Sequence, residues 1–220
     1  RFGSDFISED VIKIQTDQQP FTIKSSKSEI KSFSIIIATG ANAKRLNIPG
    51  TGDSEFWQKG VTACAICDGA SPIFRNKPLL VVGGGDSACE EAIFLTKFAS
   101  KVYIVHRREE FRASKIMQDR VRRHPNIELI LNHTLDRVEG KEFVNKVYVK
   151  NIVSGKITQI DVNGVFFAIG HTPNTSFIDS GIELDDDGYI KVHPNSTTTS
   201  VNGVFAAGDV VDKKYRQAVT

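Results

Sequence analysis

One stretch decides the fold of this chain: Leu79-Leu80-Val81-Val82-Gly83-Gly84-Gly85-Asp86-Ser87-Ala88. Its leading apolar residues predict a strand buried on both faces, and the glycines that follow predict a tight turn. Apolar residues then recur at helical spacing over residues 87–99, and residues 102–105 are strand-like again. A unit of about 30 residues with this order is typical of β-α-β. The predicted fold class is therefore α/β.

The glycine turn has the spacing G-x-G-x-x-G/A of dinucleotide-binding loops, with Gly83, Gly85 and Ala88 at the small positions. The first glycine permits the turn, the second lets the backbone approach a pyrophosphate, and the third small residue lets the helix pack closely on the strand. An ordinary strand–helix turn is the alternative, but the strand and helix around it favour a dinucleotide site. We expect Asp86 and Ser87, at the start of the helix, to belong to this site.

Basic residues follow the second strand of this unit: His106, Arg107 and Arg108, with Arg112 one turn further on. An acidic residue at this position would bind a ribose hydroxyl, whereas arginine accommodates the 2′-phosphate of NADP. Guanidinium groups suit a phosphate because they offer a planar fork of donors at fixed charge. The alternative is a solvated basic helix start, partly neutralised by the two glutamates that follow. The position after the strand favours NADP over NAD.

Three cysteines are too few for a disulfide framework in 220 residues, and they indicate a reducing compartment, the cytoplasm or an organelle. Cys64 and Cys67 form a C-x-x-C pair, which is either a redox dithiol or half of a metal site. A closed zinc site needs about four ligands. The third cysteine, Cys89, falls in the predicted helix, and His171 and His193 lack the spacing of a zinc finger. We therefore favour a redox disulfide and predict no metal.

Asp68 directly follows the second cysteine of the pair. A carboxyl group there could donate a proton to a thiolate or accept one from a thiol. A turn residue before Gly69 is the other interpretation, and the spacing alone does not choose between them. Cys89 is most simply a small buried hydrophobic residue.

The composition is that of a soluble globular protein, with 40% hydrophobic and 25% charged residues. A formal net charge of +2 gives no electrostatic reason to expect binding to nucleic acid or to an anionic membrane. No stretch approaches the roughly 18 apolar residues of a membrane-spanning helix, and the start of the chain lacks a signal-peptide pattern. The length predicts one or two domains.

The rest of the chain is predicted to consist mainly of strands. Apolar patterns predict strands at residues 11–14, 21–23, 34–38 and 127–131, the third of them buried on both faces. Residues 113–123 are predicted to be a helix. Segments near 134–139, 143–152 and 157–162 are expected to pair antiparallel, with Ser154-Gly155 as a turn. Two similar apolar runs, 164–170 and 203–209, end in glycine or glycine and aspartate.

Five sequence blocks together resemble the low-molecular-weight thioredoxin reductases, NADPH-dependent flavoproteins of the pyridine nucleotide–disulfide oxidoreductase class. The blocks are Cys64-Ala-Ile-Cys67-Asp68-Gly69, Gly83-Gly-Gly-Asp-Ser-Ala88, His106-Arg-Arg108 with Arg112, Gly203-Val-Phe-Ala-Ala-Gly-Asp209 and Arg216-Gln-Ala218. They occur in the order and approximate spacing of that family, and they span practically the whole chain. This combination is far more specific than any single motif.

The resemblance implies two cofactors, FAD and NADPH, and residues that contact each of them. The FAD contacts would be Val11, Thr39, Gly40, Cys67, Asp209, Val210, Arg216, Gln217 and Ala218. In the family the aspartate binds the ribityl–phosphate region, the Arg-Gln-Ala stretch contacts the isoalloxazine ring, and the backbone of the first strand meets the adenine. For NADPH, Ile169 and Gly170 would join the glycine turn and the arginines.

The resemblance also implies two Rossmann-like three-layer domains, an FAD domain and an NADPH domain inserted into it. We predict the FAD domain at residues 1–46 and 172–220 and the NADPH domain at 47–171, with hinges near 42–50 and 170–174. The family's first β-α-β unit, with its own glycine loop for FAD, and its final helix have no counterpart here. The chain is therefore expected to be an internal portion of a longer protein, with an incomplete FAD domain.

In this family electrons pass from NADPH through FAD to the dithiol, here Cys64 and Cys67, and on to thioredoxin, and the protein is a homodimer. We expect Cys67 to face the flavin and Asp68 to act as the acid for the departing thiolate. One alternative is a related flavoprotein with another disulfide acceptor, such as a peroxiredoxin, or a reductase fused to thioredoxin. The more distant alternative is a non-enzymatic NADP-binding module with a structural metal.

Overall fold

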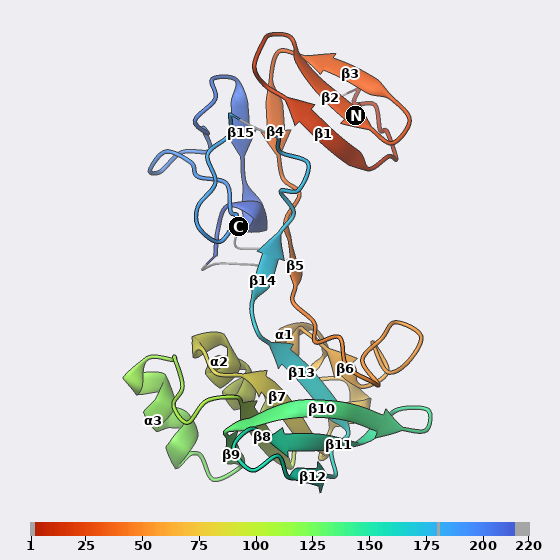
Figure 1. The fold of residues 1–220 in the computed structure, drawn as a ribbon, viewed down its shortest axis with the longest axis vertical. Coiled ribbons are helices and arrows are strands. Elements are labelled where there is room, and N and C mark those ends of the chain that lie inside the picture. Colours follow the sequence, from red (N-terminus) through yellow and green to blue (C-terminus); the bar gives the residue numbers. More distant parts are fainter. Residues whose placement is uncertain (1–2, 180, 214–220) are drawn as a thin grey trace. The chain divides into compact units, whose positions relative to one another are not determined.

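The structure, a computed structural model, describes residues 3–179 and 181–213. The chain divides into two compact units (Figure 1). Residues 1–42 and 171–220 form one, which we call the discontinuous unit, and residues 43–170 form the other, the inserted unit. The inserted unit thus begins at Ala43, ahead of the predicted start at residue 47.

A five-stranded parallel sheet forms the centre of the inserted unit (Figure 1). Its strands are, in order, β6 (Val61–Thr62), β13 (Gly164–Ala168), β7 (Pro78–Gly83), β8 (Lys101–His106) and β9 (Ile127–Leu131). Helix α2 (Asp86–Leu95) connects β7 to β8, and α3 (Lys115–Arg123) connects β8 to β9. All neighbouring pairs are parallel, so the predicted β-α-β unit and the α/β fold class are confirmed.

The two faces of this sheet carry separate cores, because side chains alternate along each strand. Leu79 and Val81 of β7 pack in one core with helices α2 and α3. Leu80 and Val82 pack in the other core against an antiparallel sheet. That sheet consists of β10 (His133–Gly140), β11 (Val144–Asn151) and β12 (Ile157–Ile160). The inserted unit therefore has three layers, and burial on both faces explains the continuous apolar run of β7.

The predicted antiparallel pairing of β10, β11 and β12 is confirmed. Between β11 and β12 the Asn151 side chain accepts from the backbone N–H groups of Val153 and Ser154, both at 2.9 Å. Gly155 follows with φ of +72°, a conformation that favours glycine. The Ser154-Gly155 turn is thus formed as predicted.

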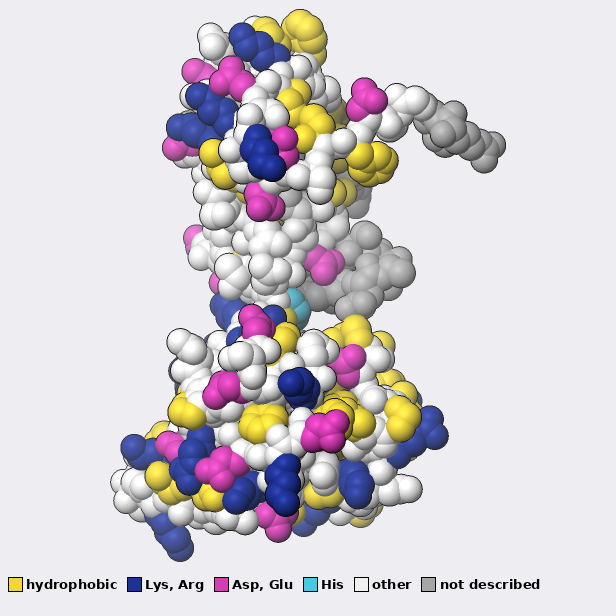
Figure 2. Space-filling model, turned by 90° about the vertical axis from the view of Figure 1, so that its right-hand side faces the viewer, with side chains coloured by type: hydrophobic (Ala, Val, Ile, Leu, Met, Phe, Trp, Pro, Cys, Tyr) yellow, Lys and Arg dark blue, Asp and Glu magenta, His cyan; other side chains and the backbone are white. Residues whose placement is uncertain are grey.

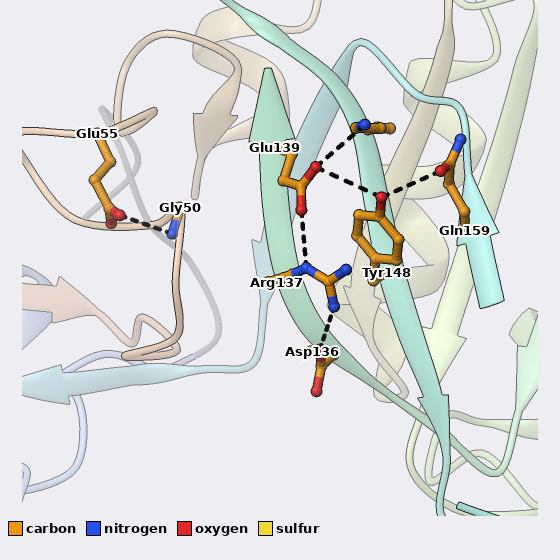
Figure 3. Close-up of polar contacts among 8 residues, drawn as sticks. Gly50, Glu55, Asp136, Arg137, Glu139, Tyr148 and Gln159 are labelled. Carbon is orange, nitrogen blue, oxygen red and sulfur yellow. Dashed lines mark hydrogen bonds and ion pairs between the residues drawn. The ribbon is translucent and has the colours of Figure 1, made fainter. Parts of the chain in front are cut away.

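A polar network crosses all three strands of this antiparallel sheet (Figure 3). The Arg137 guanidinium lies 3.5 Å from the centre of the Tyr148 ring, and its Nε donates to Glu139 at 2.9 Å. The Tyr148 hydroxyl donates to Gln159 on β12 at 3.2 Å. The hydrogen bond from Arg137, followed by that from Lys146, lowers the pKa of Glu139. Because the network is partly exposed, we expect it to align the strands more than to stabilise the fold.

Near the start of the inserted unit, the chain is hydrogen-bonded to strand β10. Pro49 O accepts from Val138 N–H at 2.9 Å, and Gly50 N–H donates to Glu55 at 3.0 Å (Figure 3). Gly50 has φ of +89°, and a Cβ there would lie 2.0 Å from Val138 O. Of the predicted hinge at 42–50, residues 49–50 are therefore fixed to the inserted unit.

Two predicted helix ends are wrong. Helix α2 ends at Leu95 instead of residue 99, because the N–H groups of Lys97 and Phe98 donate to carbonyls three residues back, at 3.2 and 2.9 Å, and the chain turns there. Helix α3 begins at Lys115 instead of residue 113. Ser114, with ψ of 148°, is its N-cap residue and is not helical, and the Ala113 N–H donates to Gly84 O at 3.2 Å.

The discontinuous unit contains the antiparallel sheet β1-β2-β3 and a parallel strand pair. Its strands are β1 (Val11–Gln15), β2 (Phe21–Ser25), β3 (Glu29–Ser32), β4 (Ile35–Ile37) and β15 (Val204–Ala206), with a 3-10 helix at Gly208–Val210. The paired strands β5 (Ala41–Ala43) and β14 (His171–Pro173) lie where the chain passes between the units. β3 was not predicted, because Ile30 is its only apolar residue.

The prediction that residues 34–38 form a strand buried on both faces is wrong. Ile37 is 3% exposed, but Ile36, which points to the opposite side, is 74% exposed. In the part of the chain that the structure describes, β4 pairs with β15 alone. A β-branched run therefore specified the strand correctly but not the burial of its second face.

Figure 2 shows acidic and basic side chains interspersed on the face that it displays, without an extended patch of one sign. Among the described residues, no helix combines the length and the apolar character that crossing a membrane requires.

We predict that Phe166→Ala destabilises the inserted unit by about 3–5 kcal/mol. Phe166 is fully buried in β13, and its ring meets that of Phe74 edge-on at 5.1 Å. Urea unfolding followed by the fluorescence of Trp57, the single tryptophan of the chain, measures this unit. Phe143→Ala is the matched control, since Phe143 is 41% exposed. Equal losses for the two variants would contradict the core assignment.

Candidate active site

The cysteine pair lies at the start of a short helix in the inserted unit. Helix α1 (Ala65–Asp68) begins after Cys64, which is its N-cap residue. Cys64 and Cys67 form a disulfide with Cα atoms 5.3 Å apart, and the Cys67 backbone N–H donates to Cys64 Sγ at 3.2 Å. Cys67 is exposed and Cys64 is half-buried. The pair is thus joined as a disulfide, and the more exposed of its two residues is Cys67.

Thr62, at the end of β6, holds Asp68 beside this disulfide. Its hydroxyl donates to Asp68 Oδ2 and accepts from Cys64 N–H at 3.3 Å. Thr62 is itself buried, so the carboxyl group is held from inside the protein. Asp68 is the residue directly after Cys67, so its carboxyl group is a candidate for proton transfer to a thiolate. Asp68 also serves in a turn, because its carbonyl accepts from Ser71 N–H at 2.8 Å.

The three glycines after β7 have three different surroundings. A Cβ at Gly83 would lie 2.4 Å from Ala168 O, and one at Gly84 would lie 2.2 Å from the His106 ring. A Cβ at Gly85, the N-cap residue of α2, would meet nothing within 4 Å. The first two glycines therefore permit close packing, and the third leaves an open backbone at a helix N-terminus, where anions bind favourably.

Residues 107–114, which we call the arginine loop, run beside these glycines. Arg112 N–H donates to Gly84 O at 2.8 Å. Arg107, Arg108 and Arg112 are exposed. Within residues 3–179 and 181–213, no ion pair occupies any of their guanidinium groups. Three cationic groups thus remain available next to an open glycine backbone.

His106 does not face this open surface. Its ring is 7% exposed and packs against Gly84, and its Nε2 lies 3.1 Å from Glu110 O. Because a carbonyl oxygen only accepts, Nε2 must carry the proton. Burial, and then the neighbouring arginine charges, lower the pKa of His106. A neutral, buried ring does not fit the predicted role of a coenzyme ligand.

The other predicted NADPH residues divide into two groups. Ala88 is fully buried against Gly83, and Asp86 Oδ1 accepts from the backbone N–H and the hydroxyl of Ser114, at 2.8 and 2.9 Å. The side chains of Ala88 and Asp86 thus contact other residues of the protein. Ser87 is exposed in the first turn of α2. Ile169 and Gly170 follow β13, whose last residue pairs with Gly83. They therefore lie at the carboxyl ends of the parallel strands, as the glycines do.

Apart from Cys67, the predicted flavin residues that the structure describes lie in the discontinuous unit, and their exposure varies. Val11 is 40% exposed, Asp209 is half-buried, and Val210 is fully buried. Gly40 and Gly208 have positive φ, and a Cβ at either would meet nothing within 4 Å. Cys67 belongs to the other unit. Arg216, Gln217 and Ala218 lie outside the described residues.

Asn174 is a residue that sequence reasoning missed. It holds the turn at Thr39 and Gly40: the Thr39 hydroxyl donates to Asn174 O at 2.8 Å, and Asn174 Nδ2 donates to Thr39 O at 2.9 Å. The Asn174 N–H donates to Gly40 O at 3.0 Å. The partners are 135 residues apart, so no local pattern indicates them.

The third cysteine, Cys89, is fully buried in α2, as predicted. Burial, and then the charges of Asp86 and Glu90, raise the pKa of its thiol to about 11. Because the thiolate is the reactive form, Cys89 is expected to be inert at neutral pH.

The accessible residues of the inserted unit fit NADPH. Gly85 offers an uncrowded backbone for a pyrophosphate, and the arginine loop offers exposed guanidinium groups for a further phosphate. For FAD the described residues offer the open turns at Gly40 and Gly208.

The sequence pattern of one family, pyridine nucleotide-disulphide oxidoreductase, matches residues 3–220. The mitochondrial thioredoxin reductase 1 of Arabidopsis thaliana is 53% identical over 225 residues, covering 100% of this chain and 60% of that protein. The thioredoxin reductase of Chlamydia pneumoniae is 52% identical over 220 residues, covering 100% of this chain and 71% of that protein. The chain thus spans 60% of the length of the plant relative.

Solved structures agree with these sequence matches. Thioredoxin reductase from Giardia duodenalis has a TM-score of 0.85 and 45% identity, covering 99% of this chain and 71% of that one. Thioredoxin reductase from Streptococcus pyogenes has a TM-score of 0.81 and 38% identity, covering 95% of this chain and 67% of that one.

We predict that Gly85→Ala weakens NADPH binding by about tenfold or more, the equivalent of about 1.4 kcal/mol. A methyl group there would occupy the open backbone at the start of α2 without meeting other protein atoms. The melting temperature should therefore stay close to that of the unsubstituted chain. Gly83→Ala is the contrasting variant, which should lower the melting temperature because its Cβ meets Ala168 O. Unchanged NADPH binding by Gly85→Ala in a calorimetric titration would contradict the prediction that the pyrophosphate binds at this loop.

Proposed function

The chain belongs to the pyridine nucleotide-disulphide oxidoreductases and, among them, to the thioredoxin reductases, and on this premise we propose that it takes part in electron transfer from NADPH, through FAD and the Cys64–Cys67 disulfide, to thioredoxin. The observation that carries the proposal is the accessible Cys64–Cys67 disulfide in the same unit as the open glycine and arginine loops.

The chain's own residues would bind and orient the coenzyme. The Gly85 backbone N–H and the start of α2 would hold the pyrophosphate. Arg107, Arg108 and Arg112 would bind the 2′-phosphate that distinguishes NADPH from NADH. When bound, NADPH and FAD supply the hydride and two-electron chemistry, which side chains cannot perform. For FAD the proposed contacts remain those of the family resemblance.

The disulfide is the group of this chain that changes its covalent state. Two electrons and two protons convert the Cys64–Cys67 disulfide into two thiols. One of these, as a thiolate, attacks the disulfide of thioredoxin and forms a mixed disulfide. The other cysteine then attacks the mixed disulfide, which releases reduced thioredoxin and restores Cys64–Cys67. Asp68, whose carboxylate accepts a hydrogen bond from Thr62, is the residue that we propose gives a proton to a departing thiolate.

A different disulfide acceptor, such as a peroxiredoxin, or a fused thioredoxin remains the alternative, and it uses the same residues. The metal-binding module has less support, because both thiols of the C-x-x-C pair are engaged in a disulfide. Three or more potential metal ligands do not cluster anywhere in residues 3–179 and 181–213.

A homodimer and a cytoplasmic location, with an organelle as the alternative, complete the proposal. Relatives from Arabidopsis and two yeasts are called mitochondrial.

We predict that Cys67→Ser abolishes thioredoxin reduction by the full-length protein, while NADPH still bleaches the flavin absorbance. The reason is that hydride transfer to the flavin does not need the dithiol. Stopped-flow absorbance and a thioredoxin-coupled assay measure the two steps. Cys89→Ala is the matched control, since Cys89 is buried away from the surface, and it should keep both steps. Loss of flavin bleaching together with turnover in Cys67→Ser would mean that the pair is structural.

We also predict that replacing Arg107 and Arg108 by alanine weakens NADPH binding about a hundredfold, by about 3 kcal/mol, and leaves NADH binding nearly unchanged. NADH has no 2′-phosphate for these side chains to bind. Calorimetric titration of the chain with each coenzyme measures both affinities.

The matched control for the arginine prediction replaces Arg122 and Arg123 by alanine. This double substitution removes the same charge from the C-terminal end of α3. This control should change neither affinity by more than about twofold, because exposed charges beyond a Debye length of about 8 Å are largely screened. Equal losses for both coenzymes in the first variant would contradict the phosphate-binding role.

A further inference from the structure

We propose that Asp86, Ser114 and His106 are positioning residues that fix the arginine loop before the coenzyme arrives, and that they do not bind the coenzyme themselves. The inference rests on the proposed function, because it concerns how the 2′-phosphate is selected. It differs from the sequence-based expectation, in which Asp86 and His106 were ligands.

The end of the arginine loop is tied to the start of α2 by a single carboxylate oxygen. Asp86 Oδ1 accepts from Ser114 N–H at 2.8 Å and from the Ser114 hydroxyl at 2.9 Å. Ser114 is the residue before α3. Both hydrogen bonds are charge-assisted and therefore stronger than those of a neutral acceptor. Asp86 thus joins the first turn of α2 to the beginning of α3.

The glycine turn holds the same end of the loop through its backbone. Gly84 O accepts from Arg112 N–H at 2.8 Å and from Ala113 N–H at 3.2 Å. With Ser114, three consecutive backbone N–H groups donate to the glycine turn and to the residue that begins α2. The position of Arg112 relative to Gly85 is therefore set by the protein alone.

Hydrogen bonds to neighbouring parts of the inserted unit fix the start and the middle of the arginine loop. His106 packs against Gly84, and its Nε2–H donates to Glu110 O at 3.1 Å. The centre of its ring lies 5.3 Å from that of the Phe111 ring. Arg108 O accepts from Asn132 N–H at 3.2 Å. The loop backbone is thus fixed at its start, middle and end, while its guanidinium groups stay free of ion pairs in the described part of the chain.

A fixed backbone has a consequence for coenzyme selection. Ordering a loop costs conformational entropy at the moment of binding, and a loop that is already ordered avoids that cost. Only NADPH draws its affinity from the arginines, so loosening the loop should weaken NADPH more than NADH. The selectivity, the ratio of the two dissociation constants, is therefore the quantity that the positioning residues control.

The sign of the effect separates positioning from simple electrostatics. An exposed carboxylate near a phosphate site repels the phosphate, so removing its charge should strengthen NADPH binding if charge were its only role. Asp86→Ala removes the charge and both hydrogen bonds, whereas Asp86→Asn removes the charge and keeps an acceptor oxygen. Positioning predicts weaker NADPH binding for the first variant and not for the second.

The experiment titrates the chain and its variants with NADPH and with NADH. For Asp86→Ala we expect about tenfold weaker NADPH binding, the size of one lost charge-assisted hydrogen bond, and less than about twofold change for NADH. Asp86→Asn should keep the selectivity, and Ser114→Ala should lie between, since its backbone N–H still donates. Asp119→Ala, an exposed aspartate of α3, is the control for charge.

Hydrogen exchange on the coenzyme-free chain gives a second readout that does not depend on binding. The amides of Arg112, Ala113 and Ser114 should be protected, and Asp86→Ala should speed their exchange at least about tenfold. Rapid exchange of these amides in the unsubstituted chain would overturn the proposal, because the loop would not be fixed beforehand.

Three binding outcomes would also overturn it. Equal weakening for both coenzymes in Asp86→Ala would make Asp86 a ligand of their common part, and unchanged or tighter NADPH binding would make it a bystander. In both cases the unsubstituted chain would still prefer NADPH, and the proposed function would stand. An unsubstituted chain without any preference for NADPH would instead overturn the coenzyme assignment itself, and this inference with it.

Discussion

The proposed coenzyme site depends on one close approach, that of the Gly84 backbone to the His106 ring. A Cβ at Gly84 would lie 2.2 Å from the ring, so the imidazole fits against the turn only because the residue has no side chain. The Gly84 carbonyl in turn accepts from the N–H groups of Arg112 and Ala113. A residue without a side chain therefore fixes the strand end, the glycine turn and the arginines relative to one another.

Helix α2 links this site to the disulfide within the inserted unit. Its N-terminal turn follows the glycine turn of the proposed coenzyme site, and its C-terminal half packs against α1, the helix of the cysteine pair. At Gly69, which ends α1, a Cβ would lie 2.5 Å from Ala65 O and 2.7 Å from Leu95 of α2. The glycine turn and the helix of the cysteine pair thus both contact α2, so the packing of its buried face, which includes Ala88 and Leu95, affects both.

Local patterns predicted the elements well, and distant contacts explain what they missed. The apolar run of β7, the glycine spacing and the C-x-x-C pair depend on neighbours in sequence, so they could be interpreted without a structure. The burial of His106, the use of Asp86 by Ser114 and the exposure of Ile36 depend on which segments meet in space. Asp86 and Ser114 are 28 residues apart, and no period or spacing relates them.

The central claim is that NADPH electrons reach the Cys64–Cys67 disulfide, and counting thiols tests it most directly. The flavin-loaded, full-length protein is incubated with excess NADPH without oxygen, denatured, alkylated and weighed by mass spectrometry, and a sample without NADPH is treated alike. Of the three cysteines in this 220-residue chain, only Cys89 should be alkylated without NADPH, and all three with it. The same single alkylated cysteine in both samples would contradict the account.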